Sequence, residues 1–131
     1  MKKKITVAID SPAAAGAGTQ AKLIAKYYNL FYLDTGKIYR YIGLLRLKNL
    51  KNFNYSLIKK KIKNLKMKDL QNKTLLSDEV AISASIIAKN NKIRKIVFNF
   101  QKKCAYSPPL KYNGSVLDGR DITSVIMKDA M

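Results

Sequence analysis

The chain of 131 residues contains no histidine and only one cysteine, Cys104. One cysteine excludes a framework of intrachain disulfides, and without histidine the common Cys/His zinc sites cannot form. These scarcities predict a protein of a reducing compartment, the cytoplasm.

Long hydrophobic runs are also missing. The basic start at residues 1–4 resembles the beginning of a signal peptide, but the apolar run that follows stops at Asp10, too early for one. No later segment has the length and apolar character of a membrane span, so we expect no membrane partner. The 47% of apolar residues suffice to bury the core of one domain.

Acidic residues are scarce: eight stand against 26 lysines and arginines, for a net charge of +18. Such a balance fits a nucleic-acid or membrane-surface binder, or the lysine- and asparagine-rich composition of an AT-rich genome. The lysines are scattered, with short groups at residues 2–4 and 59–61, and no aromatic-interleaved stripe accompanies them. We therefore interpret them as solvated surface and expect no specific nucleic-acid partner, although the charge attracts anionic nucleotides.

Residues 5–19 are the organising segment. A β-branched run ends at Asp10, a loop of small residues follows, and a helical pattern begins near Ala17. This order suits a loop that binds phosphate through main-chain N–H groups and a helix N-terminus. Against the pattern G-x-x-x-x-G-K-[ST], Ser11 replaces the first glycine and Ala17 the lysine, while Gly16, Gly18 and Thr19 are kept. An ordinary strand-to-helix turn is the alternative interpretation.

Hydrophobic spacing predicts the remaining elements. Strands are expected at about 5–10, 30–33 and 115–117. Helices are expected at about 17–28, 37–48, 57–65, 77–89 and 92–104, with a loop through about residue 72 and another around the Pro108-Pro109 pair. The first helix should carry Leu23, Ile24, Tyr27 and Tyr28 on one apolar face.

Each apolar strand ends in an acid, at Asp10, Asp34 and Asp118, and a turn should follow each. In a parallel sheet with right-handed crossovers these three ends meet at one edge, outside which ligands bind.

The chain has only four arginines, Arg40, Arg46, Arg94 and Arg120. Where composition favours lysine so strongly, a retained arginine indicates a need for its planar fork, which suits phosphate or a base edge.

Four segments together resemble the bacterial cytidylate kinases, which are P-loop nucleoside monophosphate kinases. They are AIDSPAAAGAGTQAK, YLDTGKIYR, EVAISASIIAKNNKIRK and VLDGRDITSVI. The resemblance covers essentially the whole chain. It implies an α/β fold, a P-loop NTPase-type parallel sheet flanked by helices, with a helical insert that binds the nucleoside monophosphate. Residues 1–36 and 112–131 would form the core, and residues 37–111 the insert and connecting helices.

The resemblance also implies a reaction, in which the γ-phosphoryl of ATP passes to CMP or dCMP with Mg²⁺ as cofactor. ATP would be held by the loop residues Ser11, Ala14, Ala15, Gly16, Ala17, Gly18 and Thr19. CMP would be held by Thr35, Arg40 and Arg120 at its phosphate and by Ser85, Arg94 and Asp121 at its base. Asp118 and Arg120 would be catalytic, and Asp10 and Asp118 would orient Mg²⁺ through water.

The chain departs from the family pattern in three ways. Ala17 removes a positive charge, and Lys22 is poorly placed to replace it. The segment of residues 63–76 is shorter than the corresponding part of the family's insert. The chain stops at Met131, where the family continues with a lid, a last strand and a last helix. Without these, an uncovered apolar edge would favour dimerisation or poor solubility.

Three functions therefore stay open. The first is a cytidylate kinase, and the second is a catalytically impaired nucleotide-binding module of the same family. The third is a basic nucleic-acid-binding protein, which predicts strongly salt-dependent affinity without preference for cytidine.

Overall fold

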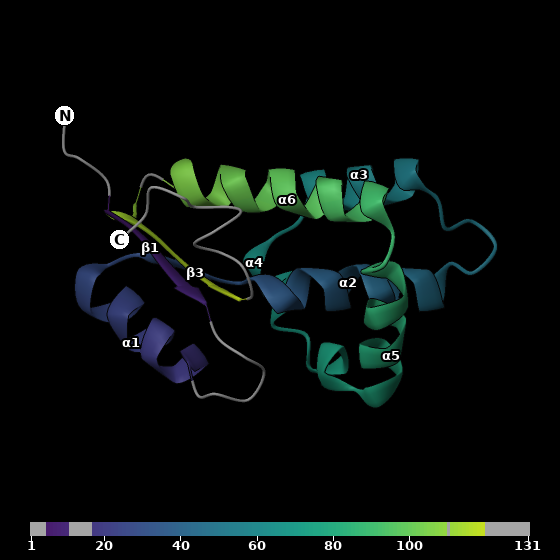
Figure 1. The fold of residues 1–131 in the computed structure, drawn as a ribbon, viewed down its shortest axis with the longest axis horizontal. Coiled ribbons are helices and arrows are strands. Elements are labelled where there is room, and N and C mark those ends of the chain that lie inside the picture. Colours follow the sequence, from purple (N-terminus) through teal and green to yellow (C-terminus); the bar gives the residue numbers. More distant parts are fainter. Residues whose placement is uncertain (1–4, 11–16, 110, 120–131) are drawn as a thin grey trace. The chain divides into compact units, whose positions relative to one another are not determined.

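A computed structural model describes residues 5–10, 17–109 and 111–119 of the chain. Its contacts divide the chain into two compact units (Figure 1). Unit 1 comprises residues 1–35 and 99–131, and unit 2 comprises residues 36–98. The sequence-based division into a core and an insert has other bounds and stays a prediction.

Unit 1 is built on a parallel sheet of three strands, β1 (Ile5–Asp10), β2 (Phe31–Asp34) and β3 (Gly114–Gly119). The strand order is β1-β3-β2, so β3 lies in the middle and pairs with both neighbours in parallel. The three strands expected from the sequence are confirmed, and so is the α/β class with its parallel sheet.

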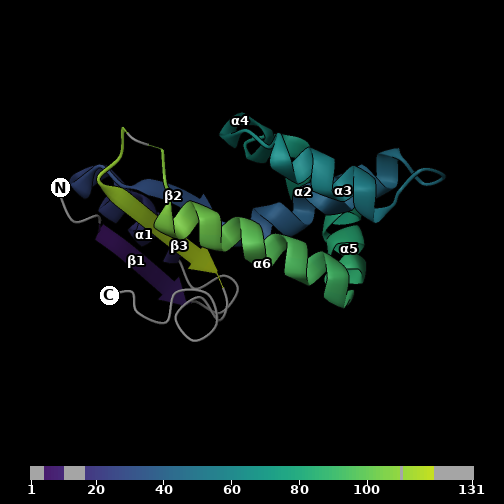
Figure 2. The ribbon, with the colours of Figure 1, turned by 90° about the horizontal axis from the view of Figure 1, so that it is seen from above.

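Helices cover both faces of this sheet (Figure 2). On one face, α1 (Ala17–Tyr28) packs Ala21 and Ala25 against Val116 of β3. On the other, the hydroxyl of Ser115 donates a hydrogen bond to the carbonyl oxygen of Ala105 at 2.6 Å, in the last turn of α6 (Asn91–Tyr106). Ser115 and Val116 are successive residues of one strand, so their side chains point to opposite faces.

The bounds of α1 agree with the sequence, but only one residue of its expected apolar face packs on the core. Ile24 contacts the buried cluster, whereas Leu23, Tyr27 and Tyr28 are 63%, 81% and 50% exposed. The side that meets the sheet carries the buried Ala21 and Ala25, whose small side chains let the helix lie close to β3. Bulky residues at helical spacing therefore indicated the packed face only in part.

Asn29 ends α1 in the left-handed region, with φ of 54°. The backbone N–H of Leu30 donates to the carbonyl oxygen of Ala25 at 2.8 Å, which closes the turn. The side-chain amide of Asn29 donates to the carbonyl oxygen of Lys111 at 3.0 Å, and its own carbonyl accepts from the N–H of Asn113 at 2.8 Å. One residue thus links the start of β2 to the segment that enters β3.

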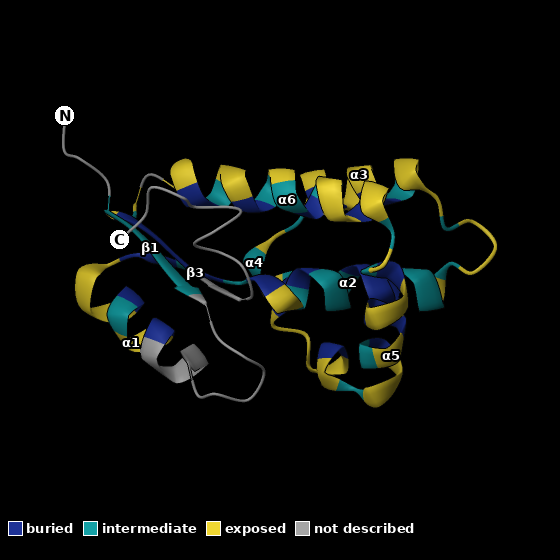
Figure 3. Ribbon diagram, viewed as in Figure 1, coloured by how far each residue is buried: buried dark blue, intermediate teal, exposed yellow. Residues whose placement is uncertain are grey.

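Unit 2 is helical, and its buried side chains line the facing sides of its helices (Figure 3). It contains most of α2 (Thr35–Lys48), then α3 (Tyr55–Lys63), α4 (Met67–Leu70), the 3₁₀ turn η1 (Lys73–Leu76), α5 (Asp78–Ile87) and the first half of α6. Its fully buried side chains include Ile38 and Ile42 of α2, Ile58 of α3 and Val97 of α6. These positions follow the helical spacing predicted from the sequence.

Polar side chains cap three of these helices. Asn54 accepts from the N–H of Leu57 at 2.9 Å at the start of α3, and Ser77 accepts from the N–H of Val80 at 3.3 Å at the start of α5. Asn90 accepts from the N–H of Lys92 at 2.9 Å, directly before α6 begins at Asn91. Ser77 is thus the N-cap of α5, which begins at Asp78 as the expected range 77–89 implies.

Three local predictions were wrong. The turn expected after Asp34 is absent, because α2 begins at once with Thr35. The loop expected to reach residue 72 contains α4, whose Asp69 carboxylate accepts from the N–H of Lys66 at 2.9 Å. Helix α6 runs two residues further than expected, to Tyr106, and stops before the Pro108-Pro109 pair. None of the helices in the described part of the chain is long and apolar enough to span a membrane.

Candidate functional site

The carboxyl ends of the three strands lie in register at one edge of the sheet. Asp118 of β3 is level with Asp34 of β2 and with Ile9 of β1, and Asp10 is level with Gly119. The expectation that three acidic positions meet at one edge is therefore confirmed for the backbone. This edge is where parallel α/β sheets bind ligands.

The order of strand, loop and helix expected for residues 5–19 is also confirmed. Strand β1 ends at Asp10, and α1 begins at Ala17, with Gly18 and Thr19 in its first turn. The remaining expected loop residues lie outside the described residues: Ser11, Ala14, Ala15 and Gly16. Arg120 and Asp121, which follow β3, lie outside them as well.

Thr35 is the junction between the sheet and the next helix. It follows the last residue of β2 directly, is the first residue of α2, and is 4% exposed. Because α2 starts without a connecting turn, Thr35 is fixed by the strand on one side and by the helix on the other.

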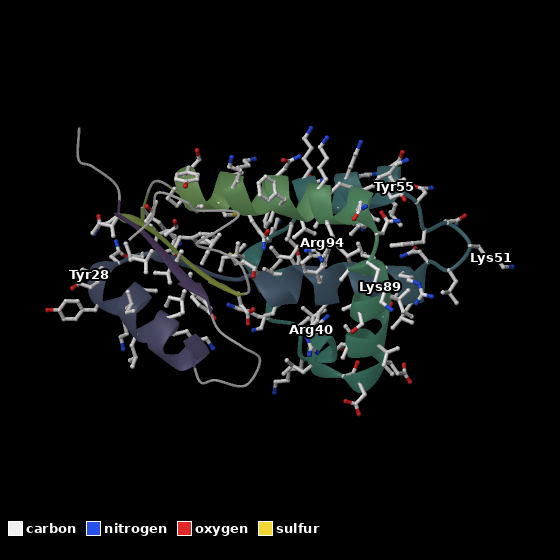
Figure 4. All side chains as sticks on the ribbon, viewed as in Figure 1. Tyr28, Arg40, Lys51, Tyr55, Lys89 and Arg94 are labelled. Atoms are coloured by element: carbon white, nitrogen blue, oxygen red, sulfur yellow. The ribbon has the colours of Figure 1, made fainter. Side chains whose placement is uncertain are left out.

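Arg40 is half-buried one turn further along α2. Its Nη1 donates a hydrogen bond to the carbonyl oxygen of Leu75 in η1, at 2.8 Å (Figure 4). Leu75 itself is buried in a cluster with Leu44 and Val80. One N–H of the guanidinium is thus anchored on packed structure, and arginine has five such donors.

Arg94 and Ser85 are exposed on α6 and α5. The Nη1 of Arg94 donates to the carbonyl oxygen of Ala88 at 3.2 Å, and the hydroxyl of Ser85 donates to the carbonyl oxygen of Ala81 at 3.1 Å. Tyr39 of α2 lies near Arg94: burial raises the pKa of the Tyr39 phenol, and the positive charge of Arg94 partly opposes that rise.

Three of the expected site residues thus lie in unit 2, each hydrogen-bonded to a main-chain carbonyl. Within residues 36–98, all of which are described, no hydrogen bond joins any two of Arg40, Ser85 and Arg94. Their donor groups are held by the backbone and not by one another. Each arginine therefore has further donors for an acceptor-rich ligand.

The sequence matches the profile of the cytidylate kinase family over residues 7–131. The chain belongs to the cytidylate kinase family. This confirms the resemblance seen in the four motifs.

Curated relatives that carry the name cytidylate kinase agree. The protein of Paramagnetospirillum magneticum is 40% identical over 125 residues, which cover 95% of this chain and 59% of the relative. That of Bartonella tribocorum is 41% identical over 133 residues, covering 98% and 58%. That of Ureaplasma urealyticum is 39% identical over 142 residues, covering 99% and 62%. The chain therefore spans about three fifths of the length of these relatives.

Reasoning from motifs missed one connection in this member of the cytidylate kinase family. The Nη1 of Arg46 on α2 donates to the hydroxyl of Ser83 on α5 at 3.2 Å, and this buried hydroxyl donates to the carbonyl oxygen of Gly43 at 2.8 Å. A Cβ added at Gly43 would lie 2.8 Å from the backbone nitrogen of Ala84, so the two helices cross closely here. The scarcity of arginine had singled out Arg46, but not its partner.

Proposed function

We propose that this chain takes part in transferring the γ-phosphoryl group of ATP to CMP or dCMP, giving CDP or dCDP and ADP. The proposal rests on the hydrogen bonding of Arg40 and Arg94, two arginines of the family motifs. Each donates one hydrogen bond to a main-chain carbonyl and has further donors for a ligand.

On this proposal, Arg40 holds the CMP phosphate together with Thr35 and Arg120. Ser85, Arg94 and Asp121 read the base: Arg94 donates to the acceptor edge of cytosine, and oxygen atoms accept from its exocyclic amine. Anchoring of Arg40 at Leu75 and of Arg94 at Ala88 restricts both guanidiniums before the ligand arrives. Such restriction lowers the entropy lost on binding.

The ATP phosphates would meet the main-chain N–H groups between Ser11 and Thr19 and the start of α1. Asp10 and Asp118 fit a role toward Mg²⁺, because carboxylate oxygens are the ligands that this ion prefers and both residues stand at the ends of paired strands. We assign them to its water ligands. Mg²⁺ bound with ATP neutralises phosphate charge, while Asp118 and Arg120 orient the reacting groups.

A nucleotide-binding module without turnover is the second candidate, and Ala17 is the observation that favours it. The missing ammonium group would leave part of the charge of the transferring phosphoryl unopposed. Loss of one such electrostatic contact commonly lowers the rate ~10²–10³-fold. Binding of CMP, which uses other residues, would survive that loss.

A coupled assay of ADP release separates these candidates. The natural chain and its Ala17→Lys variant are given ATP, Mg²⁺ and, in turn, CMP, dCMP, UMP and AMP. We expect turnover that requires CMP or dCMP and that rises ~10²-fold or more in the variant. Turnover in neither protein, together with a melting temperature raised by CMP but not by AMP, would instead identify the binding module. No response to CMP of any kind would overturn the proposal.

A cytoplasmic location also stays a proposal. It rests on the single thiol and the nucleotide chemistry.

A further inference from the structure

The positive charge of the chain is concentrated in unit 2. Residues 36–98 contain sixteen lysines and arginines against three acids, a net charge of +13 out of the total of +18. The rest of the chain contributes ten basic residues against five acids. A compositional preference for lysine raises the total, but it does not by itself explain why the acids are absent from particular helices.

Three α-helical segments of unit 2 carry basic side chains and no acid: α2, α3 and the first half of α6, residues 91–98. Of these, α3 and residues 91–98 have the highest share of exposed lysines. Their exposed lysines form what we call the basic face: Lys59, Lys60, Lys61, Lys63, Lys92 and Lys95. The two helices begin next to each other, because the side-chain amide of Asn90 donates to the Tyr55 hydroxyl at 2.8 Å. Both lie on the same side of α2 (Figures 1 and 2).

Within residues 36–98 the acids lie outside the basic face. The acids of unit 2 are Asp69 on α4 and Asp78 and Glu79 in the first turn of α5. Throughout residues 36–98, which are fully described, no ion pair involves a lysine of the basic face; Lys92 instead lies over the Tyr55 ring, 5.1 Å from its centre. Like charges held together without partners repel one another, so an anionic ligand would stabilise this arrangement.

The side chains around the basic face indicate which class of anionic partner it suits. Both helices use their apolar sides in the core, through Ile58 and Ile62 in α3 and Ile93 and Val97 in α6. No apolar side is left to enter a membrane, which amphipathic surface helices require. The arginine of these two segments, Arg94, is already assigned to the cytosine base, and the exposed side chains that remain are lysine point charges, without the planar forks that read base edges. Such a set matches a regular row of phosphates.

We propose that the basic face binds the phosphate backbone of nucleic acid without reading its sequence. If all six lysines contact phosphates, the logarithm of the affinity should fall with the logarithm of the salt concentration with a slope of roughly −4, at ~0.7 per contact on a single strand. The proposal does not depend on the kinase reaction, because none of these lysines is assigned to CMP or ATP.

Fluorescence anisotropy with a labelled 20-nucleotide oligouridylate, over a series of KCl concentrations, tests it. The variant Lys60→Glu/Lys63→Glu/Lys95→Glu reverses the charge at three positions of the basic face. The matched control, Lys22→Glu/Lys26→Glu/Lys111→Glu, makes the same change in net charge at exposed lysines of unit 1. We expect the face variant to bind at least ~10-fold more weakly, with a slope smaller by ~2, and the control to change the affinity less than ~3-fold.

Equal losses in the two variants would overturn the proposal, since net charge alone would then explain the binding. Tighter binding to phosphatidylserine vesicles than to the oligonucleotide would overturn it as well. A third variant, Lys60→Gln/Lys63→Gln/Lys95→Gln, guards against misfolding caused by charge reversal. With an unchanged melting temperature it should still lose affinity and reduce the slope by ~2.

Discussion

The guanidinium of Arg46 on α2 donates a hydrogen bond to the hydroxyl of Ser83 on α5, with Nη1 3.2 Å from Oγ. That hydroxyl is buried and donates in turn to the carbonyl oxygen of Gly43, so one serine joins two positions of α2 to α5. Two residues further along α5, Ser85 is exposed and bonds only to its own helix. The two serines therefore separate the structural contribution of Ser83 from the ligand-binding one proposed for Ser85.

Substitution of the buried serine should lower stability. In Ser83→Ala, Arg46 loses its acceptor and the α2–α5 crossing loses its hydrogen-bonded link. We expect the free energy of unfolding, measured by urea denaturation, to fall by about 1–2 kcal/mol. The melting-temperature shift that CMP produces should stay within error of that of the parent protein.

Ser85→Ala is the matched change on the same helix. Its hydroxyl is exposed, so the free energy of unfolding should move by no more than about 0.5 kcal/mol. If Ser85 reads cytosine, the shift produced by CMP should shrink while stability is kept. Equal destabilisation by the two substitutions would contradict the assignment of the link to Ser83.

Close approach of α2 and α5 predicts the effect of Gly43→Ala. Alanine favours a helix over glycine by about 1 kcal/mol. The added Cβ, however, would lie 2.8 Å from the nitrogen of Ala84 and 3.2 Å from the carbonyl oxygen of Val80, both backbone atoms. Such overpacking costs about 1–3 kcal/mol, so we expect a lower melting temperature in a thermal scan. A rise, which helix propensity alone predicts, would contradict the close crossing.

Features that depend on local sequence were predictable. Apolar runs that end in an acid located all three strands, and a parallel sheet places the ends of these strands at one edge. The helix starts expected near residues 77 and 92 also agree with the structure, where Ser77 and Asn90 cap α5 and α6 through neighbouring residues only. The family motifs indicated Arg40 and Arg94 as candidate site residues, which stays a prediction.

Features that depend on packing were not predictable. In α1 the large Tyr27 is exposed and the small Ala25 is buried, although side-chain size favours burial of the tyrosine. The distance between the helix and the sheet decides which side chain fits between them. Short turns such as α4 are too brief for periodicity to reveal. The acceptors of Arg40, Arg46 and Arg94 lie 35, 37 and 6 residues away, and no spacing rule identifies a carbonyl or hydroxyl brought close by folding.

The left-handed turn at Asn29 gives a prediction for unit 1. Its φ of 54° costs alanine about 1–2 kcal/mol and costs glycine almost nothing. Both Asn29→Ala and Asn29→Gly lose the side-chain hydrogen bond to Lys111, so that loss cancels when the two are compared. We expect Asn29→Ala to be the less stable of the two by about 1–2 kcal/mol in urea denaturation. Equal stability would show that backbone conformation contributes nothing here.

Because burial disfavours ionisation of the Cys104 thiol, we expect alkylating reagents to modify it slowly at mildly alkaline pH. Burial raises its pKa from 9.0 to about 11, and nearby Lys103 only partly opposes this. At pH 8 the folded protein should therefore hold about 100-fold less thiolate than the unfolded chain, and iodoacetamide should modify it more slowly by a similar factor than in urea. Equal rates in the two states would contradict the buried environment.

The same shift makes stability depend on pH in one direction. Between pH 9 and 11 the unfolded chain has released the Cys104 proton while the folded protein retains it, so rising pH favours unfolding across this window. The partly buried tyrosines Tyr39 and Tyr41, whose pKa values are also raised, add to the trend. Cys104→Ala removes only the thiol contribution, so it serves as the reference. Urea denaturation should show that the parent protein loses stability relative to this variant from pH 8 to pH 10.5, and a constant difference would exclude the proposed ionisation.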